Sequence, residues 1–266
     1  MYTAISADGT SIGFAKTGTG PPLVLVHGTT ADHTRWTPIL PRFEPHFTVY
    51  AMDRRGRGGS GDAPDYDLIR EAQDVAAVVD AAAAEQGQSV NVLGHSFGAL
   101  CSLESALLTH NVRRLVLYEP PIPTGVEMYP PGILDRIDAA IEGGHNEAAL
   151  TIFFREVVGM PDHEFEVYRR LPVWRTRIAL APTIAREAYY DQKYELHPER
   201  LVAIQIPTLL LVGGDSPESM RAGAATVHAA IPGSRVVTLA GQQHVAMDTD
   251  PALFTTEVLG FLLDSQ

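Results

Sequence analysis

Five consecutive residues, Gly94 to Gly98, have the spacing of a site built around a nucleophilic serine. They read GHSFG and fit the pattern G-x-S-x-G, in which the serine stands on a sharp turn between a strand and a helix. Glycine two positions before and two positions after Ser96 removes the Cβ atoms that such a turn would crowd. A helix that starts beside Ser96 would offer free backbone N–H groups and the positive end of its dipole to a developing negative charge.

The residues on either side of this motif predict the strand and the helix that it needs. Residues 90–93 form a short apolar run typical of a buried strand, and leucine recurs at helical spacing over residues 100–107. Ser96 is therefore a candidate nucleophile. A serine hydroxyl is weak in this role, and it needs an adjacent base that a third group orients.

Two loops in the second half of the chain contain candidates for the base and the acid that orients it. LVGGDSP places Asp215 after one predicted strand, and GQQH places His244 after the next. Because the carboxyl ends of parallel strands meet at one edge of a sheet, Ser96, Asp215 and His244 can come together there. The chain order serine, acid, histidine is the one expected on such a sheet. Glu119 also follows a predicted strand after the serine and is the alternative acid.

With these motifs the chain resembles the α/β-hydrolase superfamily over nearly its whole length. The matching stretches are HGTT, DRRGRGGS, GHSFG, LVGGDSP and GQQH. The resemblance implies an oxyanion hole formed by the backbone N–H groups of Thr29 and Phe97. It favours Asp215 over Glu119 as the acid, because the loop around Asp215 is the closer match to the family. The serine at the elbow disfavours the relatives that use an aspartate nucleophile, the epoxide hydrolases and haloalkane dehalogenases.

The order of the predicted elements indicates an α/β fold. Residues 2–17 predict a hairpin with Asp8-Gly9 as its turn, and strands and helices alternate after it. This alternation predicts a mostly parallel central sheet covered by helices on both faces. It breaks over residues 121–205, where the pattern is mostly helical, and then resumes. We therefore expect a core of residues 1–120 and 206–266 with a helical cap of residues 121–205.

The predicted cap is rich in aromatic residues, and the resemblance implies that it covers the site as a lid. Most of these side chains are expected to form the core of the cap itself. Trp174 and Tyr190 are the candidates to face a bound substrate.

Composition excludes several classes of partner. The chain has 266 residues, and its 32 acidic residues outnumber 20 basic ones, for a net charge of −12. No basic stripe is available to meet nucleic-acid phosphates. No stretch approaches the roughly 18 apolar residues of a membrane helix, and the N-terminus lacks the pattern of a signal peptide. We therefore expect a cytoplasmic protein that binds neither nucleic acid nor membrane; the pattern leaves its oligomeric state open.

Two further motifs bear on cofactors. Gly56 to Gly61 reads GRGGSG and fits a dinucleotide-binding fingerprint, but Asp62 to Asp65 separates it from the next predicted helix, and Asp80 falls inside that helix. We interpret it as a loop beside the site, with its arginines solvated or paired with acids. Cys101 is expected to be a buried core thiol. The histidines show no metal-ligand spacing, so neither a cofactor nor a metal is predicted.

Together these patterns predict a serine hydrolase that cleaves small to medium apolar carboxylic esters or lactones through an acyl-enzyme. The same three residues could serve cofactor-free perhydrolysis, as in haloperoxidase-like relatives, or the hydrolysis of carbon–carbon bonds. A non-enzymatic ligand receptor on this fold is a further alternative, because a fold does not fix a function.

Overall fold

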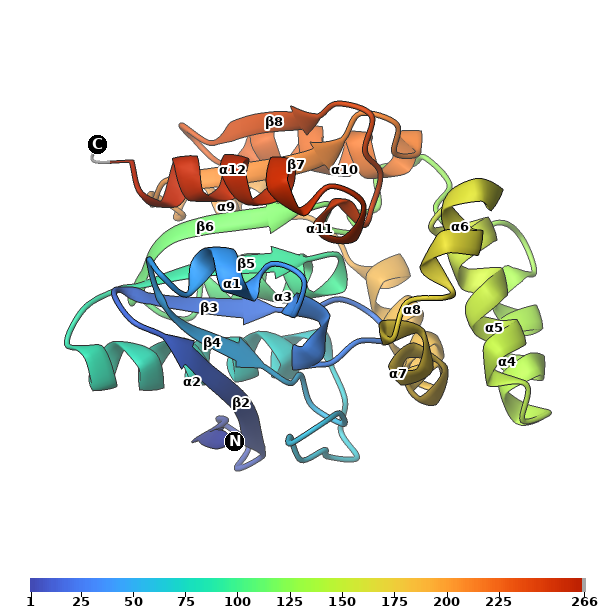
Figure 1. Ribbon diagram of the computed structural model, residues 1–266, viewed down its shortest axis with the longest axis horizontal. Coiled ribbons are helices and arrows are strands. Elements are labelled where there is room, and N and C mark those ends of the chain that lie inside the picture. Colours follow the sequence, from blue (N-terminus) through green and yellow to red (C-terminus); the bar gives the residue numbers. More distant parts are fainter. Residues whose placement is uncertain (265–266) are drawn as a thin grey trace.

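An eight-stranded sheet forms the centre of the computed structural model, which describes residues 1–264 (Figure 1). The strands are β1 (Tyr2–Ile5), β2 (Ser11–Gly18), β3 (Pro22–Val26), β4 (Thr48–Met52), β5 (Val90–His95), β6 (Val112–Tyr118), β7 (Thr208–Gly213) and β8 (Arg235–Leu239). Their order in the sheet is β1-β2-β4-β3-β5-β6-β7-β8. The first two strands are antiparallel to their neighbours and the others are parallel, so the predicted α/β class is confirmed.

The central strands are mostly apolar and are buried throughout, because helices cover both of their faces. Every residue of β3, β4, β5 and β7 is buried, as is usual for parallel strands with two covered faces. The predicted hairpin is present as β1 and β2. Its turn contains Gly9 with a φ of 87°, a backbone conformation that glycine adopts without steric cost.

Two layers of helices enclose the sheet. The helices α2 (Leu68–Gln86), α3 (Phe97–Ser105) and α10 (Glu218–Ala230) pack on one face, and α1 (Leu40–Phe43) and α12 (Pro251–Leu262) pack on the other (Figure 1). Between β3 and β4 the chain forms two short helical pieces, a 3₁₀ turn at His33–Trp36 and α1. Pro38 lies between them, and proline both removes an N–H donor and disfavours a helical residue before it.

Except for α9 (Pro198–Leu201), which lies against the core, the helices of residues 121–205, which we call the cap, lie beyond the carboxyl ends of the parallel strands (Figure 1). They are α4 (Ile133–Glu142), α5 (Asn146–Ile152), the π-helical turn η2 (Phe153–Val157), α6 (Asp162–Tyr168), α7 (Val173–Leu180), α8 (Thr183–Lys193) and α9 (Pro198–Leu201). The cap has its own apolar cluster, which Val245 of the core joins. Leu201 and Ile204, at its end, pack into the main core instead. The exact domain boundaries stay a prediction.

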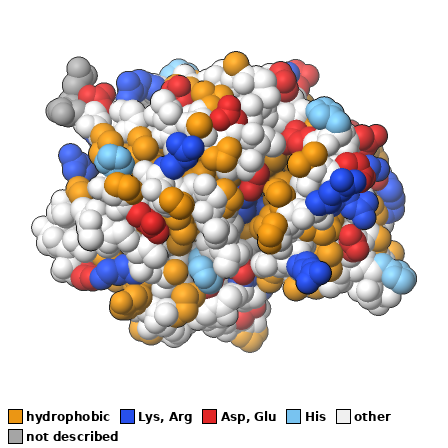
Figure 2. Space-filling model, viewed as in Figure 1, with side chains coloured by type: hydrophobic (Ala, Val, Ile, Leu, Met, Phe, Trp, Pro, Cys, Tyr) orange, Lys and Arg blue, Asp and Glu red, His pale blue; other side chains and the backbone are white. Residues whose placement is uncertain are grey.

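The surface of the cap mixes charges of both signs. Figure 2 shows basic and acidic side chains side by side over the helices at the right of the view. Arg155 and Arg169 form ion pairs there with acidic residues of α5 and α6, such as Glu147 and Glu166. Among residues 1–264, no helix combines the length and the apolar character needed to cross a membrane.

Candidate active site

Ser96 stands on a strained turn between β5 and α3, as the motif predicts. Its φ is 56°, in the left-handed region that few residues other than glycine adopt. A Cβ on Gly94 would lie 2.6 Å from the Cα of Ala99, and one on Gly98 would lie 2.3 Å from the carbonyl oxygen of His27. Both glycines are therefore required by close packing. The backbone N–H of Ser96 donates to the carbonyl of Tyr118 (2.8 Å), which ties the elbow to the end of β6.

The backbone N–H groups of Thr29 and Phe97 are available for a ligand. Neither donates a hydrogen bond within residues 1–264. Phe97 begins α3, so its N–H belongs to the free first turn of that helix. The loop that carries Thr29 lies against the elbow, since a Cβ on Gly28 would come within 2.8 Å of the Cβ of Ser96. This arrangement suits an oxyanion hole, and that role stays a prediction.

His244 is oriented by Glu119. Its Nδ1 lies 2.5 Å from Oε2 of Glu119, and both side chains are buried. The other carboxylate oxygen of Glu119 accepts hydrogen bonds from the N–H of Gly213 (2.7 Å) and the hydroxyl of Ser216 (2.5 Å). The acid is therefore fixed by three donors from two loops. Glu119 has a φ of 47°, so its backbone, like that of Ser96, is strained in the left-handed region.

The structure corrects the expectation that Asp215 lies against His244. The side chain of Asp215 is exposed, and its backbone N–H donates to the carbonyl of Gln242 (3.0 Å). Strand β6 lies directly beside β5 in the sheet, whereas β7 is one strand further away. The loop after β7 therefore supports the carboxylate of Glu119 through Ser216, and its own Asp215 does not contact His244.

Two residues that the sequence analysis missed fix the loop of His244. Nε2 of His95 donates to the backbone carbonyl of His244 (2.8 Å). The hydroxyl of Tyr118 donates to the carbonyl of Gln243 and accepts from the N–H of Ala246 (3.2 Å). Burial lowers the pKa of His95 well below its ordinary value, so it stays neutral and acts here as a donor. Both residues end strands next to the site, a signal that was present in the sequence.

Within residues 1–264, the hydroxyl of Ser96 and Nε2 of His244 are not hydrogen-bonded to each other, and neither has another hydrogen-bond partner. Contacts between a nucleophile and its base are often long until a substrate tightens them. The backbone already places the two residues together, because the ring of His95, adjacent to Ser96, lies 4.7 Å from the ring of His244. The site thus holds a serine, a buried histidine–carboxylate pair and two free N–H donors at one edge of the sheet.

His27 shapes the loop below this site. Its Nδ1 donates to the carbonyl of Gly28 (2.9 Å), and its Nε2 accepts from the backbone N–H of Arg54 (3.1 Å). Burial, with the nearby charge of Arg54, lowers the pKa of His27 well below its ordinary value. Both ring nitrogens are thus occupied by structural bonds, so His27 is not available as a base.

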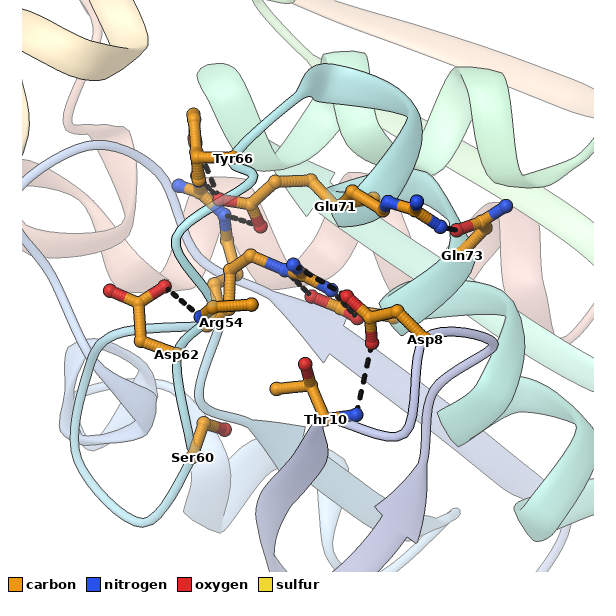
Figure 3. A network of polar contacts seen from close by, with 12 residues as sticks. Asp8, Thr10, Arg54, Ser60, Asp62, Tyr66, Glu71 and Gln73 are labelled. Carbon is orange, nitrogen blue, oxygen red and sulfur yellow. Dashed lines mark hydrogen bonds and ion pairs between the residues drawn. The ribbon is translucent and has the colours of Figure 1, made fainter.

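The arginines of the glycine-rich loop are buried and paired with acids (Figure 3). Arg54 forms a two-pronged pair with Glu71 (2.7 and 3.0 Å), and the hydroxyl of Tyr66 donates to the same carboxylate. The guanidinium of Arg54 also lies over the ring of Phe97, with 4.6 Å from its Cζ to the ring centre. From the cap, Glu187 of α8 pairs with Arg54 (3.2 Å) and Arg57. This cluster fastens the cap to the core beside the elbow.

Replacing Glu187 by glutamine is expected to destabilise the protein by about 3–5 kcal/mol, because it leaves the buried charge of Arg57 without its closest partner. Urea unfolding would measure this loss. The matched control is Glu156→Gln, which breaks an exposed cap pair with Arg136 and should change the stability little, because water screens exposed charges. Equal small losses for both variants would show that the buried cluster does not fasten the cap.

Asp53 anchors the glycine-rich loop from within. Its carboxylate accepts from the backbone N–H of His33 (2.7 Å) and from that of Gly59 (2.8 Å). A Cβ on Gly58 would come within 2.2 Å of this carboxylate, which explains a glycine at that position. Asp32, His33 and Asp53 bring ligand atoms close together, but the oxygens of Asp53 are already occupied by protein donors. We therefore interpret the group as a loop anchor.

The two aromatic residues expected to face a substrate have partners of their own. Trp174 is buried in the apolar cluster of the cap, and its indole N–H donates to Glu147 (3.0 Å). The hydroxyl of Tyr190 donates to the carbonyl of Tyr66 (2.5 Å). These contacts account for both side chains, and a part in substrate binding stays a prediction. Cys101 is buried, as expected.

Known proteins resemble this chain in sequence and in fold. A solved structure of an alpha/beta hydrolase from Sphaerobacter thermophilus DSM 20745 is 36% identical, with 98% of this chain and 100% of that chain covered and a TM-score of 0.84. The solved structure of an esterase from Rhodococcus sp. ECU1013 is 25% identical, with 100% of this chain and 99% of that chain covered and a TM-score of 0.81.

Two curated relatives have more specific names. A 2-(acetamidomethylene)succinate hydrolase of Mesorhizobium japonicum is 24% identical over 92% of this chain and 89% of its own length. An N-formylmaleamate deformylase of Pseudomonas putida is 37% identical, but the match spans only 47% of this chain and 48% of that protein. The model of the alpha/beta hydrolase family matches residues 23–257. The chain therefore belongs to the alpha/beta hydrolase family.

Proposed function

We propose that the protein is a serine hydrolase that cleaves small to medium carboxylic esters or lactones, with Ser96, His244 and Glu119 as its catalytic residues. The observation that carries this proposal is the buried contact between Glu119 and His244 beside a serine on a strained elbow. A carboxylate in this position fixes the tautomer of the histidine and stabilises its protonated form.

In the proposed reaction, the hydroxyl of Ser96 attacks the carbonyl carbon while Nε2 of His244 takes its proton. The N–H groups of Thr29 and Phe97 bind the oxyanion that forms, and each such donor typically contributes on the order of 10²–10³ in rate. The bond to the leaving oxygen then breaks, and His244 returns the proton to it. Water, activated by His244, hydrolyses the acyl-enzyme and frees Ser96.

A second candidate reaction is the hydrolysis of an amide bond. Two relatives are named as a deformylase of a maleamate and as a hydrolase of an acetamido-substituted succinate, and both names describe nitrogen-linked acyl groups. The same serine, histidine and oxyanion donors would serve, with His244 protonating a nitrogen. Perhydrolysis and the hydrolysis of carbon–carbon bonds remain alternative reactions of the same residues. A non-enzymatic ligand receptor on this fold also remains an alternative.

The test is turnover on esters, lactones and amides graded by acyl length. The proposal expects many cycles per protein molecule on at least one ester series, together with labelling of Ser96 by an organophosphonate. Faster turnover of the amides would favour the second candidate. A protein that is labelled once and never turns over would contradict the enzyme and favour a receptor.

A further inference from the structure

Arg177, in α7 of the cap, lies over the loop that carries the proposed oxyanion donor Thr29. Its side chain is 3% exposed. Its Nη1 donates to the carbonyl of Thr29 (3.0 Å) and to the hydroxyl of Thr30 (2.8 Å). Its Nε is buried and has no hydrogen-bond acceptor within residues 1–264. A guanidinium has five N–H donors, so this one retains unused donors next to the site.

The charge of Arg177 has no carboxylate partner within residues 1–264. The nearby acid Asp248 is occupied by Arg35, whose two terminal nitrogens lie 2.9 and 2.6 Å from its two oxygens. This differs from the glycine-rich loop, where Arg54 and Arg55 each face a buried acid. An unpaired buried charge is costly, because it gives up hydration without a compensating ion pair.

Two aromatic rings of the cap flank the guanidinium of Arg177. Its Cζ lies 5.1 Å from the ring centre of Phe154 and 5.5 Å from that of Tyr168. The buried hydroxyl of Tyr168 lies near it without a hydrogen bond of good geometry. Tyr168 also lines a cavity of about 390 Å³, together with Gln243 and the acids Glu164 and Asp248; Arg177 is not among the residues that line it. Gln243 immediately precedes His244, so this cavity reaches the loop of the proposed base.

We propose that Arg177 binds a carboxylate that the substrate carries in the same molecule as its scissile carbonyl group. The planar guanidinium matches a carboxylate, and its unused Nε–H is a charge-assisted donor. Because Arg177 contacts the carbonyl of Thr29, a substrate whose carbonyl oxygen meets the N–H of Thr29 would place a nearby carboxylate within its reach. This inference rests on the proposed function and replaces a purely apolar substrate with an anionic one.

A purely structural role for Arg177 makes different predictions. Thr30 has a φ of 55°, and Arg177 could simply hold this strained loop in place through Nη1. In that case its loss would slow charged and neutral substrates alike. If Arg177 binds a carboxylate, its loss would instead change the ratio of the rates on charged and neutral substrates. Matched pairs of substrates therefore distinguish the two roles.

The first experiment compares monomethyl and dimethyl esters of malonic, succinic and glutaric acid on the unmodified protein. Each pair has the same scissile ester and differs in one carboxylate, which the dimethyl ester masks. For the best chain length, kcat/KM for the monomethyl ester is expected to exceed that for the dimethyl ester by on the order of 10². Equal rates, or a preference for the dimethyl esters at all three lengths, would overturn the proposal.

The second experiment repeats the comparison on variants. Arg177→Gln is expected to remove the preference for the monomethyl ester, mainly through a raised KM, and Arg177→Lys is expected to retain part of it. The control is Arg136→Gln, which removes an equal charge from an exposed site of the cap and should leave the preference intact. A preference that survives in Arg177→Gln, or an equal loss on both esters, would contradict the proposal.

A binding measurement separates this inference from the proposed function. Calorimetry with succinate and glutarate on the Ser96→Ala protein needs no turnover. Binding that disappears when Arg177→Gln is added supports the carboxylate site, even if no ester is hydrolysed. Ester turnover without any binding that depends on Arg177 would overturn the inference and leave the hydrolase proposal in place.

Discussion

Replacing Ser96 by alanine is expected to lower kcat for ester hydrolysis by on the order of 10⁴–10⁶ while the protein stays folded. The hydroxyl makes no hydrogen bond within residues 1–264, so its loss removes no structural contact. Any remaining activity would come from the oxyanion donors and from binding, which do not need the nucleophile. Steady-state kinetics with thermal unfolding of the same preparation would measure both quantities.

The control for this substitution is Ser89→Ala, which removes a hydroxyl from an exposed position at the start of the same strand region. It should leave both the rate and the unfolding temperature unchanged. An organophosphonate should add to one residue of the unmodified protein and to none in Ser96→Ala. An adduct elsewhere, or a Ser96→Ala variant with the original rate, would remove Ser96 from the mechanism.

Replacing Glu119 by glutamine is expected to lower kcat by on the order of 10⁴, whereas Asp215→Asn should change it little. Glutamine can present an N–H to Nδ1 of His244, which would put the proton on Nε2 and leave no acceptor for the proton of Ser96. The neutral side chain would also cease to stabilise the protonated imidazole. Asp215 is exposed and makes no side-chain contact with His244, so the loss of its charge should not reach the site.

Glu119→Asp is the informative companion variant. It keeps the negative charge but is one methylene shorter, so it cannot reach His244 and the loop after β7 at the same time. An intermediate rate is therefore expected. A near-normal Glu119→Gln enzyme beside an inactive Asp215→Asn enzyme would reverse the assignment of the acid. Moderate losses in both would mean that either carboxylate can serve.

Much of this protein could be predicted from local sequence patterns. The elbow at Ser96 was predictable because the turn leaves no space for a Cβ at Gly94 or Gly98, and both positions lie within two residues of the serine. The hairpin at Gly9 and the central strands followed from turn chemistry and from apolar runs of strand length. In each case the cause and the effect lie close together in the chain.

The tertiary structure decided which of the two candidate carboxylates meets His244. Glu119 and Asp215 both follow strands that end at the same edge, so local sequence could not separate them. The order of the strands brings Glu119 beside the elbow, and the turn after β7 points Ser216, and not Asp215, toward it. Likewise, nothing in the local sequence distinguishes Arg177 from other helical arginines. Only the packing of the cap on the core buries it against the loop of Thr29. Sequence determined which residue types were available, whereas side-chain direction and long-range packing selected those that meet.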